Sequence, residues 1–373
     1  MQPNPPSREN IVWLTSVNNV GFTQLGLIIN YCRKHEVSLG QVCDNPRQLR
    51  YENISEKVVK SIQSFKKEYT VSNWIEHLNE SGIKYLLMTD NYYPTLLKTI
   101  HQPPPVLFYK GEFRSRWWRL PVSMVGSRNM TAYGKMATQS LVSELVDLGA
   151  STVSGGMYGV DLVVHQETIV AGGQTTVVLG HGHFHSYPSW ISRDHQQLLE
   201  EEAVILSQFA PYVHPSRGSF VARNRVVAGI SPTLVVVEAA EKSGTHVTAQ
   251  FALDENRDVC AVPGPINNPY SQGTKWLINQ GARMVSSGAE ILFSDGHEKE
   301  HKNLRNSAEK TSSSTGKKQL NSEVLQLIES EPLCFDQLLE QLKMDSSSLM
   351  IELTQLEIMG KIVKFGQYYR AVL

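Results

Sequence analysis

The chain has 373 residues, a length that predicts two or three domains at roughly 100–200 residues each. Its 41% hydrophobic and 19% charged residues are typical of a folded protein and exclude collagen-like and wholly disordered classes. The chain has 35 basic and 36 acidic residues, so its net charge is -1. Any binding of nucleic acid must therefore come from a local basic surface and not from the overall charge.

Cysteine usage and the N-terminal residues indicate the compartment. The four cysteines lie far apart, without zinc spacing and too few for a disulfide framework. The sequence begins Met1-Gln2-Pro3-Asn4 without an apolar stretch, so we expect no signal peptide. No apolar run reaches the roughly 18 residues of a membrane span. We therefore expect a soluble, cytoplasmic protein.

Residues 1–120 are the first predicted domain, with its connector. Most of this region predicts helices, because Phe22–Cys32 and Ile54–Phe65 carry apolar residues at helical spacing. Val106–Tyr109 then predicts a short strand. The segment 112–119 interleaves arginines with aromatic residues, which can stack bases and grip phosphates, although packing at a domain junction is the more common role.

Residues 121–293 show a different pattern, in which apolar, β-branched runs alternate with helical segments. Such alternation indicates a parallel sheet covered on both faces. The sequence therefore predicts an α/β domain with a Rossmann-like, doubly wound parallel sheet. The predicted strands are Val122–Val125, Ser151–Ser154, Thr175–Leu179, Ala203–Leu206, Thr233–Val237 and Asp258–Val262, and the predicted helices between them include Ala132–Leu148, Val160–Ala171, Phe220–Ala228, Thr245–Glu255 and Thr274–Gln280.

The last part of the chain predicts a linker and a small domain. Residues 294–319 are charged and serine-rich with almost nothing apolar, so we expect a flexible linker. Residues 320–373 predict three helices followed by a hairpin, which is the order of a winged helix. The third helix, from Ser346 to Gly360, contains no Lys or Arg, whereas a recognition helix brings basic or amide groups to the groove. We expect this domain to bind protein, or to pack on the body, rather than to read DNA.

Two motifs that suit phosphate binding each follow a predicted strand and precede a helix. In the first motif, Gly126-Ser127-Arg128, the glycine lets the backbone approach a phosphate, and Arg128 adds a bidentate hydrogen-bond donor. The second has three glycines in five residues, which indicates unusual torsions or close approach of a ligand. A simple turn and helix cap is the alternative for each. The site residues inferred from these two motifs are Gly126, Ser127, Arg128, Gly155, Gly156 and Tyr158.

Two further motifs offer similar donors. In the first of these, Arg223 and Arg225 flank Asn224 on an otherwise apolar helix. The two arginines need anionic partners, either a bound anion or an acidic group such as Glu238. The turn after the strand Thr233–Val237 combines a lysine, two hydroxyl groups and free N–H groups, more than a helix cap requires. The site residues inferred from these two motifs are Arg223, Asn224, Arg225, Lys242, Ser243, Gly244, Thr245 and Thr248.

These turns can converge on one edge of a doubly wound sheet, which predicts a site for phosphate-bearing ligands. Neither a Walker A motif nor a G-x-G-x-x-G fingerprint after the first strand is present, so a nucleotide triphosphatase or an ordinary dehydrogenase is not expected. His181, His183 and His185 alternate and could chelate a metal, but a solvated or nucleotide-facing loop is the more common reading. We predict no catalytic residue, no metal and no cofactor.

In this order, the motifs resemble those of the DprA/Smf family of DNA-processing proteins, and the resemblance covers nearly the whole chain. It implies that the N-terminal part is a helical SAM-like domain, and the C-terminal winged helix also occurs in many members. It further implies a non-enzymatic protein that binds single-stranded DNA, protects incoming DNA during natural transformation and loads the recombinase RecA. Members usually dimerise through the Rossmann domain, so we expect a homodimer.

Carried over to this chain, the resemblance implies that Arg128 holds a backbone phosphate and that the other motif residues shape and complete the pocket. A pocket deep enough for one nucleotide would reject rigid duplex. Where many members have Ala-Arg-Gly-Ile-Asp, this chain has Met157-Tyr158-Gly159-Val160-Asp161, so one family arginine is missing and Tyr158 is available to stack on a base. The histidine loop 181–185 also differs, and we expect it to adjust binding below pH ~6.5.

The alternative function is a nucleotide-binding or nucleotide-hydrolysing Rossmann protein of the lysine-decarboxylase-like (LOG) type, whose motif is Pro-Gly-Gly-x-Gly-Thr-x-x-Glu. Thr248 stands where that motif has its carboxylate, so N-glycosidic cleavage has no evident acid or base here. A third possibility is a nucleotide-sensing module that signals through the winged helix.

Overall fold

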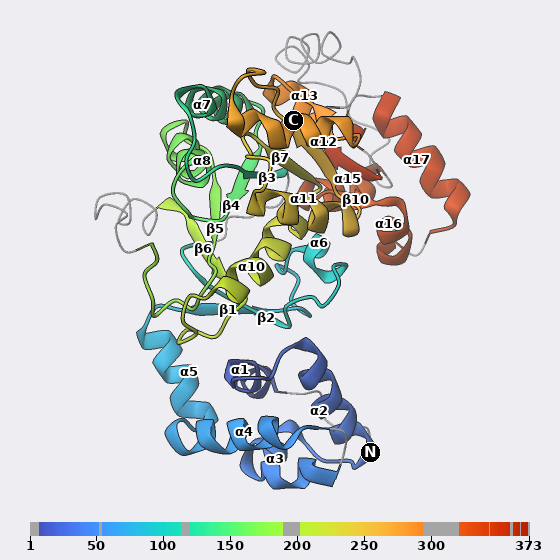
Figure 1. The fold of residues 1–373 in the computed structure, drawn as a ribbon. Helices are drawn as coiled ribbons and strands as arrows, with labels where there is room; N and C mark the ends of the chain where they lie inside the picture. The colour runs from blue at the N-terminus through green and yellow to red at the C-terminus, as the bar shows by residue number, and fades with distance from the viewer. Residues whose placement is uncertain are drawn as a thin grey trace. The chain divides into compact units, whose positions relative to one another are not determined.

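The structure is a computed structural model that describes residues 7–51, 54–112, 120–188, 202–293, 321–342, 344–358, 361–365 and 367–371 (Figure 1). The chain divides into two compact units. Unit 1 comprises Met1–Gly111, Val178–Glu200 and Val204–Val226, and unit 2 comprises Glu112–Val177, Glu201–Ala203 and Val227–Leu373.

The N-terminal part of unit 1 is helical, as predicted. Several of its helices begin at polar caps: the Ser55 hydroxyl accepts a hydrogen bond from the N–H of Val58, and the Thr70 hydroxyl accepts one from the N–H of Asn73. Between them Trp13, Phe65 and other apolar side chains form one buried core. The elements are α1 (Arg8–Ser16), α2 (Phe22–Lys34), α3 (Leu39–Asp44), the 3₁₀ turn η1 (Pro46–Tyr51), α4 (Glu56–Glu68) and α5 (Val71–Glu80).

Unit 1 also contains an antiparallel part of the sheet. The strand β1 (Lys84–Leu87) lies in a region where the sequence predicted mostly helices, and it pairs with β2 (Val106–Lys110). β2 pairs in turn with β6 (Val204–Ser207), also antiparallel. The buried Tyr93 hydroxyl donates to the carbonyl of Pro104 at 2.7 Å and ties the connection between β1 and β2 together. The helices α6 (Thr95–Lys98) and α10 (Arg217–Gly229) complete this part.

Unit 2 carries the parallel strands, and the predicted α/β, Rossmann-like architecture is confirmed. The whole sheet has nine strands in the order β1-β2-β6-β5-β4-β3-β7-β8-β9. Every residue of β3 is buried, because helices cover the sheet, and Figure 1 shows α7 and α8 side by side on it. The elements are β3 (Pro121–Val125), α7 (Ala132–Asp147), β4 (Ser151–Ser154), α8 (Val160–Val170), β5 (Thr175–Val178), β7 (Thr233–Val236), α11 (Gly244–Asp254), β8 (Asp258–Ala261), η2 (Pro269–Ser271), α12 (Gln272–Asn279), β9 (Arg283–Met284) and α13 (Gly288–Leu292).

The C-terminal region has the predicted winged-helix fold, with its own apolar core. Its small antiparallel sheet has the order β10-β12-β11. The sequence missed the short first strand, which pairs through Leu333 with Tyr369. The elements are α15 (Asn321–Ser330), β10 (Leu333–Cys334), α16 (Phe335–Leu342), α17 (Ser346–Ile358), β11 (Ile362–Phe365) and β12 (Tyr368–Ala371).

The hairpin of the winged helix packs on the body of unit 2, one of the two roles that the sequence analysis allowed. Tyr368 and Arg370 are both buried. The Tyr368 hydroxyl accepts a hydrogen bond from Arg257, and Arg370 donates to the hydroxyl of Thr233 at 3.2 Å. The opposite face of β12 carries Tyr369 into the winged-helix core.

The division into residues 1–120, 121–293, 294–319 and 320–373 stays a prediction. The aromatic and basic segment 113–119 and the linker 294–319 lie outside the described residues. Of the helices that the structure describes, none combines the length and the hydrophobicity needed to cross a membrane.

Candidate functional site

The glycine-rich turns after β3 and β4 pack directly on one another in unit 2. Gly159 has a φ of +81°, and a Cβ atom there would lie only 2.3 Å from the carbonyl oxygen of Ser127. The N–H of Val160 donates to that same oxygen at 3.2 Å. A Cβ atom on Gly126 would lie 2.6 Å from a methyl group of Val160. The two motifs, separated by about thirty residues in the sequence, therefore form one continuous surface.

The turn after β4 also packs against the neighbouring strand β5. Gly156 has a φ of +66°, and a Cβ atom there would lie 2.5 Å from Val177 on β5. Gly155 is buried, and the Asp161 carboxylate accepts a hydrogen bond from the N–H of Met157 at 3.4 Å. Gly156 thus allows the turn to approach the neighbouring strand. That Gly155 and Gly156 shape a ligand pocket stays a prediction.

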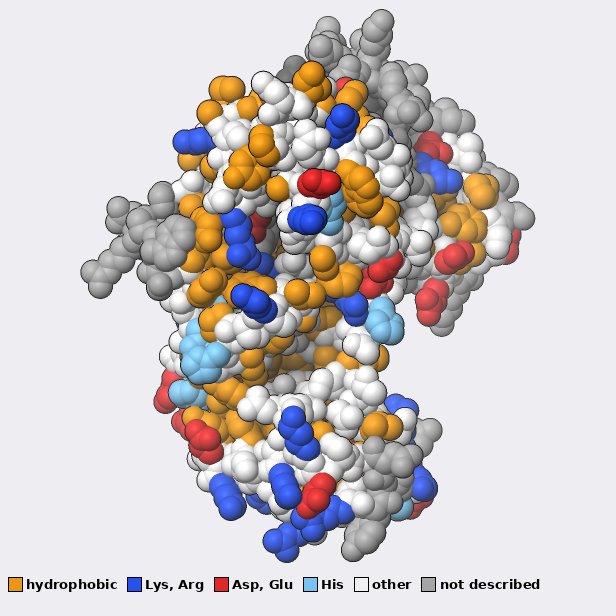
Figure 2. Space-filling model, viewed as in Figure 1, with side chains coloured by type: hydrophobic (Ala, Val, Ile, Leu, Met, Phe, Trp, Pro, Cys, Tyr) orange, Lys and Arg blue, Asp and Glu red, His pale blue; other side chains and the backbone are white. Residues whose placement is uncertain are grey.

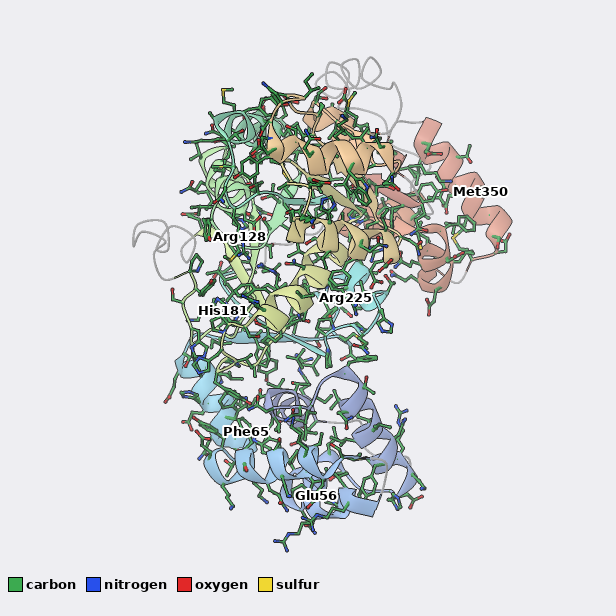
Figure 3. The ribbon with its side chains drawn as sticks, in the orientation of Figure 1. Glu56, Phe65, Arg128, His181, Arg225 and Met350 are labelled. Carbon is green, nitrogen blue, oxygen red and sulfur yellow. The ribbon has the colours of Figure 1, made fainter. Side chains whose placement is uncertain are left out.

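Arg128 and Tyr158 meet on this surface. The guanidinium carbon of Arg128 lies 6.0 Å from the centre of the Tyr158 ring, within the usual range of a cation–π contact. Arg128 is exposed and labelled in Figure 3, and at the same place in Figure 2 a basic side chain reaches the surface. These turns lead directly into the N-termini of α7 and α8. A phosphate donor and a stacking face are therefore side by side.

Ser127 contributes to the turn rather than to the open surface. Its side chain is buried, and its hydroxyl accepts a hydrogen bond from the N–H of Asn129 at 3.0 Å. The next helix, α7, is capped by Thr131, whose hydroxyl accepts from Gly134 at 3.1 Å.

A role that the sequence missed belongs to Glu238. This buried carboxylate accepts hydrogen bonds from the N–H and the hydroxyl of Thr131, at 2.8 and 2.6 Å. A Cβ atom on Gly134 would lie 2.3 Å from one of its oxygens. Glu238 therefore anchors the start of α7. The only local signal for this role was the glycine of the Thr131-x-x-Gly134 cap, which leaves room for a carboxylate. Thr131 and Glu238 are 107 residues apart in the chain, so the sequence did not reveal that they pair.

The turn between β7 and α11 divides into a cap and an exposed part. The Ser243 hydroxyl accepts from the N–H of Thr245 at 3.2 Å and donates to its hydroxyl at 2.9 Å, so these two residues cap α11. Thr248 is buried in the same helix. Lys242 and Gly244 are exposed, and a Cβ atom on Gly244 would meet nothing within 4 Å.

The arginine motif on α10 lies in unit 1. Arg223 is only 3% exposed, and its guanidinium donates to the carbonyl of Val178, at the end of β5, at 2.5 Å. Its Nε also donates to the side-chain oxygen of Asn224 at 3.0 Å. Arg225 is half-buried and donates to the carbonyl of His101 at 3.3 Å. Backbone carbonyls therefore already accept some of the arginine hydrogen bonds that the sequence analysis expected to go to anionic partners.

The histidine loop is built by hydrogen bonds to backbone carbonyls. Nε2 of His183 lies 3.1 Å from the oxygen of Phe108, and Nε2 of His185 lies 2.8 Å from that of Tyr212. Burial lowers the pKa of His183 to about 4 and also lowers the pKa of His181. The expected protonation near pH 6.5 is therefore wrong for these two. In the parts of the chain that the structure describes, no three His, Cys, Asp or Glu side chains gather as a metal site.

The chain is similar in sequence to known proteins. A family model described as DNA recombination-mediator protein A matches residues 84–294, and one described as DprA winged helix domain matches residues 308–365. The DNA processing protein DprA of Bacillus subtilis (strain 168) is 38% identical over 216 residues, which cover 57% of this chain and 71% of that protein.

Two solved structures are similar in fold. The structure of DNA processing protein A from Streptococcus pneumoniae has a TM-score of 0.65 at 26% identity and covers 78% of this chain and 99% of that one. DNA processing protein A from Helicobacter pylori, whose structure is described as giving insight into its single-stranded DNA binding mode, has a TM-score of 0.50 at 26% identity. That match covers 60% of this chain and 97% of the other.

Proposed function

Because the chain belongs to the family of DNA recombination-mediator protein A, the DprA/Smf family, we propose that it binds single-stranded DNA on the surface formed by the turns after β3 and β4. The observation that carries this proposal is the pairing of Arg128 with Tyr158 on two interlocked glycine turns. The single-stranded DNA binding described for the Helicobacter pylori protein supports it.

The chemistry of this surface favours an unpaired strand. Arg128 donates to backbone phosphate, and such contacts give affinity without sequence preference. The Tyr158 ring stacks on a base, which a duplex keeps inside its own stack. Exposed Lys242, in the same unit, supplies a second cation for the backbone. Phosphate contacts by Arg223 and Arg225 stay predictions from the sequence.

We propose that the bound strand is protected and handed to RecA, as in natural transformation, in the cytoplasm and without chemical change to the DNA. We further propose a homodimer that uses an apolar patch of unit 2. Ile266 is 86% exposed, Met284 59% and Trp276 49%, and β9, which carries Met284, is an edge strand. A second copy of the chain would cover this patch and the free edge together.

The test is fluorescence anisotropy of a labelled single strand of about 30 nucleotides, with matched duplex as competitor. Arg128→Ala should weaken binding at least tenfold, or about 1.4 kcal/mol. The matched control is Arg33→Ala, which removes an equally exposed guanidinium from α2 and should leave affinity unchanged. Equal affinities of the two variants, or equal binding of duplex, would contradict the proposal.

A further inference from the structure

Unit 1 contains a pocket of about 940 Å³ that lies apart from the residues of the proposed DNA surface. It is enclosed by α4, α5 and two loops, around residues 184 and 212–214. Its volume is that of a small-ligand site. Half of the lining residues carry rings, and the other half are polar or charged. The rings are those of Phe65, Tyr69, Trp74, Phe184 and Tyr212, together with the imidazoles of His77 and His214.

The floor of this aromatic pocket is rigid. The rings of Phe65 and Trp74 lie 5.9 and 6.1 Å from the ring of Tyr212. Nε1 of Trp74 donates to the hydroxyl of Ser16 at 2.9 Å, and the Tyr212 hydroxyl donates to the carbonyl of Ser16. The polar atoms of both rings are therefore engaged with α1, and their apolar faces are fixed. Figure 3 labels Phe65 on α4.

The mouth of the pocket is also preformed. The N–H of Phe184 donates to the carbonyl of Pro211 at 2.8 Å, which locks the two loops together. Phe184 is 41% exposed, and its ring stands edge-on to His77 at 5.2 Å. The ring of His214 lies against that of His185, tilted by 33°, with ring centres 3.9 Å apart. In Figure 2, pale blue histidines and orange hydrophobic side chains lie together at the level of α5.

Charges at the rim limit the ligand. Lys57 and Lys60 of α4 line the pocket, but so do Glu56 and Glu68, so the four charges cancel. Lys60 lies 3.3 Å from the Glu56 carboxylate. A rim without net charge does not suit a chain of phosphates. It suits one planar, uncharged ring with a single phosphate near a lysine.

We propose that this pocket takes one unpaired nucleobase of single-stranded DNA, stacked beside Phe184 and His77, with its phosphate toward Lys57. Ring faces fit every base, and a preformed mouth costs little ordering on binding. The inference rests on the proposed function, since it adds a second contact for the same ligand. Polar side chains of α4, such as Ser64, are available to the base edge.

The experiment uses the full chain and a single strand of about 30 nucleotides that carries 5-iododeoxyuridine. Irradiation should cross-link the strand to peptides that contain Phe184 or Tyr212, as mapped by mass spectrometry. Phe184→Ala should lose these cross-links and weaken anisotropy-measured binding about fivefold or more, the lower range for one lost stack. Phe184→Trp, which keeps a stacking ring, should restore both.

The matched control is Tyr92→Ala, because Tyr92 is a 70% exposed aromatic residue of the same unit outside the pocket lining. If the wild type binds, Arg128→Ala weakens binding and Phe184→Ala behaves like Tyr92→Ala without pocket cross-links, the inference is overturned and the proposed function stands. If the wild type binds no single strand, both are overturned.

Discussion

The two ends of the parallel sheet in unit 2 use arginine in opposite ways. At the carboxyl end, Arg128 is exposed beside the ring of Tyr158. At the amino end, Arg257 is 3% exposed beneath the winged-helix hairpin, and Arg370 of that hairpin is 1% exposed. Arg257 donates to the carbonyl of Gly229 at 3.1 Å and lies 5.8 Å from the centre of the Tyr368 ring.

This contrast teaches that a guanidinium over a tyrosine ring has no fixed role. The pairs Arg128–Tyr158 and Arg257–Tyr368 have nearly the same separation, 6.0 and 5.8 Å. Water reaches the first pair, so its donors can exchange water for phosphate. The second pair is buried, and Arg257 donates to the carbonyl of Gly229 and to the Tyr368 hydroxyl, so its donors hold the hairpin in place. Exposure, and not residue type, decides which pair is open to a ligand.

Arg370→Ala tests the structural half of the comparison and should have the largest effect. The change removes donors from the Thr233 hydroxyl and from the carbonyl of Leu292, which accepts at 3.3 Å, and leaves a void. We expect the free energy of unfolding to fall by about 3–4 kcal/mol, measured by urea denaturation.

Arg370→Met is the control, because an apolar side chain of similar length refills the void and should recover part of the loss. Affinity for single-stranded DNA should stay unchanged in both variants. A stability equal to that of the wild type in Arg370→Ala would show that the hairpin is not held by this residue.

The pH dependence of stability extends the comparison to a half-buried histidine in unit 1. The pKa of His183 is about 4 in the folded chain, against about 6.5 when unfolded. The unfolded chain therefore gains a proton first, so the stability contribution is complete above pH ~6.5 and is lost as the pH falls toward 4. The total loss is about 3 kcal/mol.

His183→Gln keeps a side-chain donor for the Phe108 carbonyl but does not titrate. Urea midpoints measured at about pH 7.5 and about pH 4.5 should differ less in this variant than in the wild type. Identical pH dependence in the two proteins would show that His183 does not cause the loss of stability.

Tyr158→Leu sharpens the other half of the comparison and should have the smallest effect. Loss of one base–aromatic stack should weaken single-strand binding by about 1 kcal/mol, whereas Tyr158→Phe should keep it. The free energy of unfolding should change by no more than about 0.5 kcal/mol, because Tyr158 is half-buried at the surface. Anisotropy titrations compare the affinities; equal affinity of the Leu and Phe variants would remove the stacking role.

Much of the fold follows from local sequence. The run predicted at Val122–Val125 is β3 (Pro121–Val125), and the helix predicted at Val160–Ala171 is α8 (Val160–Val170). Such runs are long and periodic enough to identify an element without its neighbours. The strand β1 was missed because its four residues, Lys-Tyr-Leu-Leu, also fit a helix, and only pairing with β2 makes them a strand.

The sequence could place the motifs of the candidate site in the fold, but it could not tell which of their residues are buried by other parts of the chain. The sequence placed Gly126, Gly155 and Arg128 at strand ends, where parallel topology brings turns to one edge. It could not show that Arg223 meets the carbonyl of Val178, 45 residues away, or that aromatic residues of α4 and α5 meet Tyr212.

The sequence by itself determined most of the elements, their order and the donor-rich turns of this protein, because propensity, periodicity and glycine placement act over a few residues. Only the tertiary structure decided which donors stay open to a ligand. Arg257 and Tyr368 are 111 residues apart, and burial of that pair depends on how the hairpin packs against the sheet. Desolvation is a property of the assembled surroundings, so no short stretch of sequence contains it.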